Sequence, residues 1–202
     1  SGRFVDEIVP VSVPRTKGPP ELFQVDEHPR QTSLQKLAAL PPVFKSGGTV
    51  TAGNSSGRND GAAALVIMAE EAARARGLTP MASIVGLGMS ALSPDIMGLG
   101  PVEASRRALQ HAGLKLEQMD LVEINEAFAA QVLAVLRGLP VPMEKLNVNG
   151  GAIALGHPIG SSGARICVTL LHEMAKRGAG YGLASLCAAG GQGIATVFRL
   201  VS

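Results

Sequence analysis

From Met81 onward, short apolar runs alternate with segments of helical composition. Apolar runs of this length, bounded by Gly and Pro, are typical of buried strands. We expect strands at residues 82–89, 120–124, 146–149, 182–187 and 193–199. We expect helices from Pro101 to Gly113, at 126–137, and from the end of a glycine-rich loop (150–163) to residue 177. This order predicts an α/β domain in which helices cover a mixed sheet.

The first 59 residues predict little regular structure, because prolines are concentrated there and each proline fixes φ and removes a backbone donor. We expect only a short strand within 8–13 and a short helix within 33–40. Residues 62–76 then have helical composition, with Asp60 as a cap and Gly77 as a stop. We expect the apolar beginning of this helix to be buried and its charged end to be exposed.

Bulk properties exclude several classes of protein. A hydrophobic content of 46%, a net charge of +2 and the absence of a Lys/Arg cluster describe a globular chain without the basic footprint of nucleic-acid binding. No run reaches the roughly 18 apolar residues of a membrane span, and we expect no secretory signal. The two cysteines, Cys167 and Cys187, do not make a disulfide framework, so we expect a cytoplasmic protein. The chain starts without Met, in a segment that reads like the interior of a longer protein.

His157 lies in the glycine-rich stretch GGAIALGHPIGSSGAR. Glycines let a backbone turn sharply and approach a ligand. A histidine in such a loop can act as a base near neutral pH or donate to a developing negative charge. The alternative is a structural histidine in a tight turn.

Cys187 ends an expected strand and enters the sequence Ala-Ala-Gly-Gly-Gln-Gly. A thiol at a strand end near a histidine can be a nucleophile or a proton shuttle. The alternative is a small buried apolar residue, as most free cysteines are. Cys167 falls on the expected apolar helix face with Ala164, Leu171 and Met174, and we assign it to the core.

Asn125 follows the strand 120–124. It could be an ordinary helix N-cap, or its amide could fix a water or a substrate oxygen. Glu126 needs a partner if it is buried, and could orient a histidine or bond to backbone amides. Phe128 could belong to the core.

A second loop of small residues, 48–61, precedes the helix expected at 62–76. Its amides and the Ser56 hydroxyl could bind a chain that carries amide or phosphate groups, or the loop could be an irregular linker. The four histidines and two cysteines show no metal-ligand spacing, so we expect no metal site.

Together and in this order, the segments TVTAGNSSGRNDGAAA, EINEAFAAQ, NVNGGAIALGHPIGSSGAR and LCAAGGQG resemble the thiolase family, which includes acetyl-CoA acetyltransferases and 3-ketoacyl-CoA thiolases. The resemblance covers the whole chain and implies the thiolase fold of two βαβαβαββ domains and a loop domain. Residues 1–59 would be the end of the loop domain, 60–80 the last helix of the N-terminal domain, and 81–202 the C-terminal domain. The chain would then be the C-terminal half of a thiolase, without the cysteine that becomes acylated.

The resemblance also implies roles for three residues in a CoA-dependent Claisen condensation and its reversal by thiolysis. A cysteine of the N-terminal half attacks an acyl-CoA thioester, and His157 activates that thiol and later helps to hold the enolate oxygen. Asn125 positions a water that shares this second task. Cys187 is the acid/base that removes or returns the α-proton of the second acyl-CoA. Backbone amides near Ala189 face the acyl-enzyme oxyanion.

Contacts with the CoA substrate follow from the same resemblance. Ser56 matches a serine that contacts pantetheine, and Arg30 a basic residue near the CoA phosphates. Met97 matches a segment near the acyl pocket, and we place Ala127 and Phe128 in the same CoA-binding set. No permanently bound cofactor is implied, and the partners would be acyl-CoA, the complementary N-terminal half and further copies in a dimer or tetramer.

Two features leave alternatives open. Ala189 stands where many biosynthetic thiolases have glycine, and CAAGGQG resembles degradative thiolases while NEAF and GGAIALGHP resemble short-chain acetyltransferases. Chain-length preference and direction therefore stay open. A non-catalytic acyl-CoA-binding or scaffold subunit is the alternative function, against which Asn125, His157 and Cys187 all argue. A decarboxylating ketoacyl synthase is disfavoured because those relatives lack the cysteine of the last motif.

Overall fold

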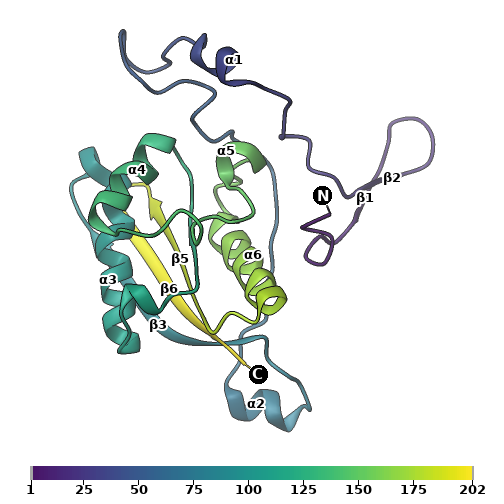
Figure 1. Ribbon diagram of the computed structural model, residues 1–202. Helices are drawn as coiled ribbons and strands as arrows, with labels where there is room; N and C mark the ends of the chain where they lie inside the picture. Colours follow the sequence, from purple (N-terminus) through teal and green to yellow (C-terminus); the bar gives the residue numbers. More distant parts are fainter. Residues whose placement is uncertain (1, 202) are drawn as a thin grey trace.

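A four-stranded sheet is the centre of the second part of the chain (Figure 1). The computed structural model describes residues 2–201. The strands lie in the order β3 (Ala82–Ala91), β6 (Gln192–Leu200), β5 (Tyr181–Ala188) and β4 (Leu121–Ile124). β6 is antiparallel to both of its neighbours, whereas β4 and β5 are parallel. The carboxyl ends of β4 and β5 therefore meet at one edge of the sheet, where α/β folds place ligands.

Helices cover the two faces of this sheet unequally (Figure 1). α3 (Gly100–Ala112) and α4 (Ala129–Gly138) pack on one face, with Val122 and Ile124 of β4 in the core between them. α6 (Ser162–Arg177) packs on the opposite face against Leu121, Ala184 and Phe198. The result is a helix–sheet–helix arrangement, as the alternation of elements predicts.

Close packing of α3 depends on two glycines of β3. A Cβ atom at Gly86 or Gly88 would overlap the carbonyl oxygen of Ala108 or Ala104. Small residues on both elements thus bring the helix axis close to the strand. The one side chain between these glycines, Leu87, points to the other face of the sheet and is 53% exposed.

Several expected boundaries agree with the structure. Gly113 and Gly178 end α3 and α6 with φ of 67° and 64°, the left-handed conformation that glycine adopts without strain. Ser33 caps α1 (Leu34–Ala38) by accepting from the amide of Lys36. The strands expected at 82–89, 120–124, 182–187 and 193–199 correspond to β3, β4, β5 and β6.

The helix expected at residues 62–76 is a wrong prediction for its first half. Only α2 (Glu70–Ala75) is helical, and residues 61–69 have no helical turn. The apolar beginning is also exposed rather than buried, with Val66 at 86% and Ile67 at 72%. These adjacent β-branched residues favour an extended chain. Both side chains are mostly exposed, so packing within residues 2–201 does not stabilise a helix here.

Two further expectations need correction. The helix expected from 126 begins at Ala129, and its N-cap is Phe128 rather than Asn125. The strand expected at 146–149 is reduced to a single bridge between Leu146 and Val122. The remaining elements were not anticipated: β2 (Glu21–Phe23), the 3₁₀ helices η1 (Pro94–Leu99) and η2 (Leu116–Gln118), and α5 (Ala152–Leu155).

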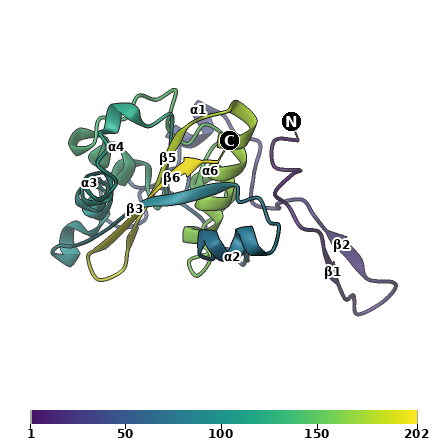
Figure 2. The same ribbon diagram turned by 90° about the horizontal axis from the view of Figure 1, so that it is seen from below.

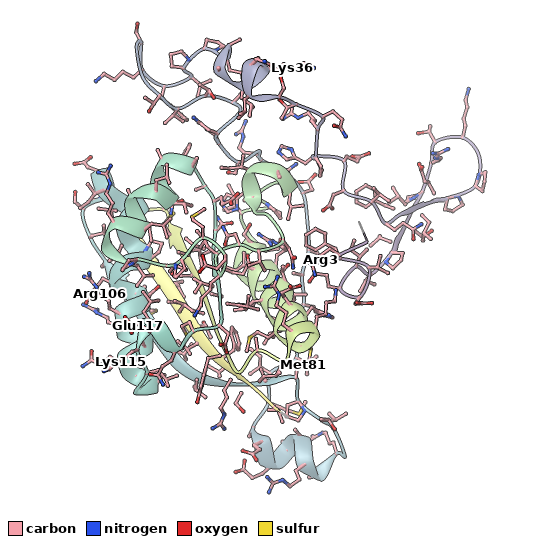
Figure 3. The ribbon with its side chains drawn as sticks, in the orientation of Figure 1. Arg3, Lys36, Met81, Arg106, Lys115 and Glu117 are labelled. Atoms are coloured by element: carbon pink, nitrogen blue, oxygen red, sulfur yellow. The ribbon has the colours of Figure 1, made fainter. Side chains whose placement is uncertain are left out.

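The N-terminal region crosses the molecule as an extended segment. β1 (Val11–Val13) and β2 form an antiparallel hairpin that projects away from the sheet (Figures 1 and 2). The residues before the hairpin lie beside α6, and the Arg3 side chain points toward this helix (Figure 3). Arg3 Nη1 lies 3.5 Å from Oε1 of the buried Glu173. Thr169 of α6 donates to Glu7 at 3.0 Å.

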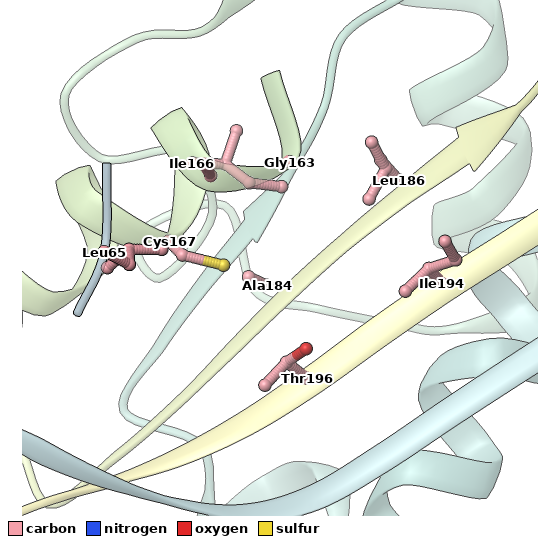
Figure 4. A pocket seen from close by; sticks show the side chains of 9 residues that line it. Leu65, Gly163, Ile166, Cys167, Ala184, Leu186, Ile194 and Thr196 are labelled. Carbon is pink, nitrogen blue, oxygen red and sulfur yellow. The ribbon is translucent and has the colours of Figure 1, made fainter. Parts of the chain in front are cut away.

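The face of the sheet that carries α6 is only partly covered. A cavity of about 290 Å³ lies between α6 and the last two strands, and Leu65, Cys167, Leu186 and Ile194 are among its lining residues (Figure 4). Among residues 2–201, none of the helices has both the length and the apolar character needed to span a bilayer.

Candidate active site

The parallel pairing of β4 and β5 brings Asn125 and Cys187 to the same edge of the sheet. Ile124 is the register partner of Ser185, and the amide of Asn125 donates to the Ser185 carbonyl at 3.0 Å. Cys187 follows two residues later on β5. Both side chains are buried, Asn125 at 1% and Cys187 at 8% exposure.

His157 reaches this edge on the glycine-rich loop between α5 and α6. Its backbone amide donates to the Gly57 carbonyl at 3.1 Å and to Asn59 Oδ1 at 3.2 Å. Gly156, with φ of 99°, passes so close to the Asn59 amide group that a Cβ would clash with it. The loop position therefore depends on a segment far upstream in the sequence.

The His157 ring contacts two side chains. Nε2 lies 3.4 Å from Asn125 Nδ2, and Nδ1 lies 2.6 Å from Ser162 Oγ at the start of α6. Asn125 Oδ1 is buried and has no hydrogen-bond partner among residues 2–201. A free acceptor beside an imidazole is suited to fix a water or a ligand group.

Burial controls the protonation of both candidate catalytic groups. Burial, and then the charge of Arg165, lower the pKa of His157 below its ordinary value, so its imidazole is neutral at pH 7 and one ring nitrogen can accept a proton. Burial raises the pKa of the Cys187 thiol above 9.0. Cys187 is therefore a thiol at neutral pH: it can donate a proton, and it becomes a base only after that proton has been given up.

The other cysteine differs in position and acidity. Cys167 lies in α6 and packs against the apolar side chains between α6 and the sheet, but it is only partly buried, because it also lines the cavity. Burial raises its pKa to about 11. Such a thiol is a poor nucleophile near neutral pH.

Glu126 supports the glycine-rich loop instead of orienting the histidine. Its carboxylate accepts from the Ile153 amide at 3.2 Å and from Asn147 Nδ2 at 3.1 Å. A Cβ at Gly151 would clash with this carboxylate. The sequence left two roles open for Glu126, orienting a histidine or bonding to backbone amides, and the structure supports the second.

Part of the expected CoA-binding set lies together beside the site. The Ser56 amide donates to the Ala127 carbonyl at 3.0 Å, and the Phe128 ring meets Phe44 edge-on with centroids 5.8 Å apart. Arg30 is exposed in the loop after β2, and Met97 is half-buried in η1.

Sequence reasoning missed two residues that position the histidine. Ser162 was detectable in principle, because a serine five residues after a candidate base and at a helix start can reach back to it. Asn59 offered no local signal, since it acts across 98 positions. In the described part of the chain, His, Cys, Asp and Glu do not gather in groups of three that could hold a metal ion.

Comparisons with known proteins decide the family. The sequence profile of the thiolase C-terminal domain matches residues 78–200, and that of the thiolase N-terminal domain matches residues 1–71. The chain belongs to the thiolase family. The acetyl-CoA acetyltransferase of Syntrophomonas wolfei is 57% identical to this chain over 199 residues, which are 98% of the chain and 50% of that protein.

Two further thiolases are similar over the same span. The human mitochondrial 3-ketoacyl-CoA thiolase is 54% identical over 98% of the chain and 50% of its own length. The crystal structure of the Bacillus anthracis acetyl-CoA acetyltransferase superimposes with a TM-score of 0.96 at 50% identity, over 99% of this chain and 51% of that one. The chain therefore has the thiolase fold and spans about half the length of the relatives that it matches.

Proposed function

We propose that this chain is part of an enzyme that condenses acyl-CoA thioesters or cleaves 3-ketoacyl-CoA. The observation that carries the proposal is the 3.4 Å contact between Asn125 and His157 at the sheet edge that also holds Cys187. The three residues come from separate segments, and a scaffold or simple binding subunit would not require this arrangement of a base, a thiol and an unpartnered amide oxygen.

The proposed reaction divides between this chain and a complementary part. A cysteine of that part attacks the thioester carbonyl of one acyl-CoA after giving its proton to His157 Nε2. Cys187 gives its proton to the departing CoA sulfur, so CoA leaves as the thiol and Cys187 becomes a thiolate. Cys187 then takes the α-proton of a second acyl-CoA. The carbanion attacks the acyl-enzyme carbonyl and expels the first cysteine as a thiolate. His157 and a water held by Asn125 stabilise the enolate oxygen in this step.

The substrates of this proposal are CoA thioesters, without a permanently bound cofactor. Ser56, Ala127 and Phe128 lie side by side next to the site and suit the pantetheine arm, while Arg30 and Met97 would contact the phosphates and the acyl pocket. An acetyl-CoA acetyltransferase and a 3-ketoacyl-CoA thiolase match the chain about equally well. A short acyl chain such as acetoacetyl-CoA is our first choice of test substrate.

The complementary part would cover the open face of the sheet. Leu87 and Met89 of β3 are 53% and 69% exposed on that face, beside the cavity lined by Leu65 and Ile194. Burying such a patch stabilises by about 25 cal/mol per Å². The assembled enzyme would form dimers or tetramers. The free thiols Cys167 and Cys187 suit the reducing cytoplasm.

Complementation tests the proposal. This chain is expressed together with the part of the Syntrophomonas relative that it does not cover, and acetoacetyl-CoA cleavage is measured spectrophotometrically. We call this assembly the complemented enzyme. We expect thiolysis by the complemented enzyme and none by the chain alone, because the acylated cysteine is absent from the latter. A stable assembly that binds CoA but never turns over would favour the alternative of a non-catalytic binding subunit.

A further inference from the structure

Ser162 occupies a position that the reaction above leaves unexplained. It is the first residue of α6 and only 1% exposed. Its hydroxyl oxygen lies 2.6 Å from Nδ1 of His157 and 3.0 Å from the carbonyl oxygen of Pro158. A hydroxyl has a single proton to donate, so if Ser162 donates to one of these two partners it can only accept from the other.

The carbonyl decides where that proton lies. The oxygen of Pro158 can only accept, so a short contact with Ser162 Oγ is favourable when the serine donates to it. Ser162 then has lone pairs, and no proton, to offer to the imidazole. The 2.6 Å contact becomes a hydrogen bond when Nδ1 of His157 carries the proton and donates to the serine. The reverse assignment would place two acceptor oxygens 3.0 Å apart without a proton between them.

The opposite side of the ring agrees with this assignment. With the proton on Nδ1, a neutral imidazole has its lone pair on Nε2. Nε2 faces Nδ2 of Asn125, which is a donor, at 3.4 Å. At 3.4 Å this contact is longer than an ordinary hydrogen bond, so the Nε2 lone pair stays available to a closer donor such as the reacting thiol.

We propose that Ser162 is a positioning residue that holds His157 as the Nδ1–H tautomer and so presents the Nε2 lone pair to the reacting thiol. Free imidazole populates both tautomers, and only this one leaves Nε2 able to accept a proton at the sheet edge. Ser162 also stabilises the imidazolium, because a donor–acceptor bond to a charged ring is stronger than one to a neutral ring.

The structure provides a matched control. Ser161 is the preceding residue, and its hydroxyl approaches the same Pro158 carbonyl at 3.4 Å. The recorded contacts of the His157 ring are to Ser162 and Asn125. Ser161→Ala removes a hydroxyl from the same turn without touching the imidazole, and Ser162→Thr keeps the hydroxyl at the critical position.

The first test is spectroscopic and does not rest on the proposed function. The complemented enzyme is labelled with ¹⁵N-histidine, and His157 is assigned by comparison with His157→Gln. We expect a protonated Nδ1 and an unprotonated Nε2 at pH 8 in the wild type, in Ser161→Ala and in Ser162→Thr. We expect Ser162→Ala to contain a mixture of tautomers. A protonated Nε2 in the wild type overturns the proposal, whatever the enzyme catalyses.

The second test is kinetic and rests on the proposed function. Single-turnover acylation by labelled acetyl-CoA should slow about tenfold in Ser162→Ala, with KM nearly unchanged, since only the competent tautomer reacts. The acidic limb of its pH profile should move to lower pH, because the imidazolium has lost an acceptor. An unchanged tautomer and pH profile in Ser162→Ala would refute the assignment. If that variant does not fold, the wild-type spectrum decides.

Discussion

Replacing Gly191 by alanine should cost more stability and more activity than replacing its neighbour Gly190. Both glycines have left-handed φ angles, 89° and 82°. A Cβ at Gly191 would approach the Leu92 carbonyl oxygen well inside the 3.0 Å that real Cβ contacts keep, whereas a Cβ at Gly190 would meet no atom within 4 Å. The obstacle is backbone, and it is fixed because the Leu92 amide donates to the Gly191 carbonyl at 2.8 Å.

The two costs can be separated. An alanine in the left-handed region costs about 1–2 kcal/mol, partly offset by the reduced freedom of the unfolded chain. We therefore expect Gly190→Ala to lower the free energy of unfolding by about 1 kcal/mol. Gly191→Ala carries the same backbone cost and adds about 1–3 kcal/mol of steric strain, which gives a total of about 2–4 kcal/mol.

The activity of the complemented enzyme should follow the same order. Relief of the clash moves the turn that follows Cys187, and a displacement of about 1 Å at a reacting group can cost on the order of 10²-fold in rate. Urea unfolding gives the stability difference and acetoacetyl-CoA cleavage gives the rate. Equal unfolding midpoints and equal turnover for the two alanine variants would refute the steric argument.

Four other predictions follow from the site and the open face. Burial raises the pKa of Glu123 to about 8, so stability should fall as pH rises from about 5 to 8, because the unfolded chain loses this proton first; Glu123→Gln should flatten that slope in urea titrations. Cys187→Ser should abolish condensation and leave acylation by labelled acetyl-CoA largely intact; loss of labelling would contradict its role. His157→Ala should slow both half-reactions by roughly 10²-fold or more, and a wild-type rate in either would argue against a dual role. The chain alone should associate in light scattering because of its exposed apolar face, and a monodisperse 20.7 kDa species that melts cooperatively would contradict this.

Local patterns were sufficient for the sheet. The strands at 82–89 and 182–187 are short apolar runs between turn residues, and their burial depends mainly on that pattern. α6 ends where Gly178 and the preceding basic residues indicate. Only two of the four residues assigned to its apolar face, Leu171 and Met174, are fully buried.

The wrong predictions share a physical cause, which is tertiary contact. Residues 62–69 have helical composition, yet their conformation depends on what covers them, and composition does not report that. Asn125 resembles an N-cap, but its side chain lies beside His157 and the helix begins at Ala129. A propensity describes an isolated segment and gives way to packing.

The sequence predicted the candidate catalytic residues but not the residues that position them. The spacing of the motifs named Asn125, His157 and Cys187 through the family resemblance, and the structure brings the first two into contact. Ser162 and Asn59 act through hydrogen bonds that depend on the path of the backbone. The role of Asn59 follows from three-dimensional geometry alone, whereas the position of Ser162, five residues after His157 at a helix start, gives a weak local signal.

The hydrogen bonds from the His157 amide to Gly57 and Asn59 affect how hybrid enzymes can be made from two thiolases. The matches to the N-terminal and C-terminal domain profiles adjoin between residues 71 and 78, and a hybrid of two relatives would naturally be joined there. Such a junction would bring in the histidine from one parent, and from the other the two groups that accept from its backbone amide, the Gly57 carbonyl and Asn59 Oδ1. A junction placed before residue 49 takes both the glycine-rich loop with His157 and the Gly57–Asn59 segment from the same parent. Hybrids made there should keep the position of His157 more often.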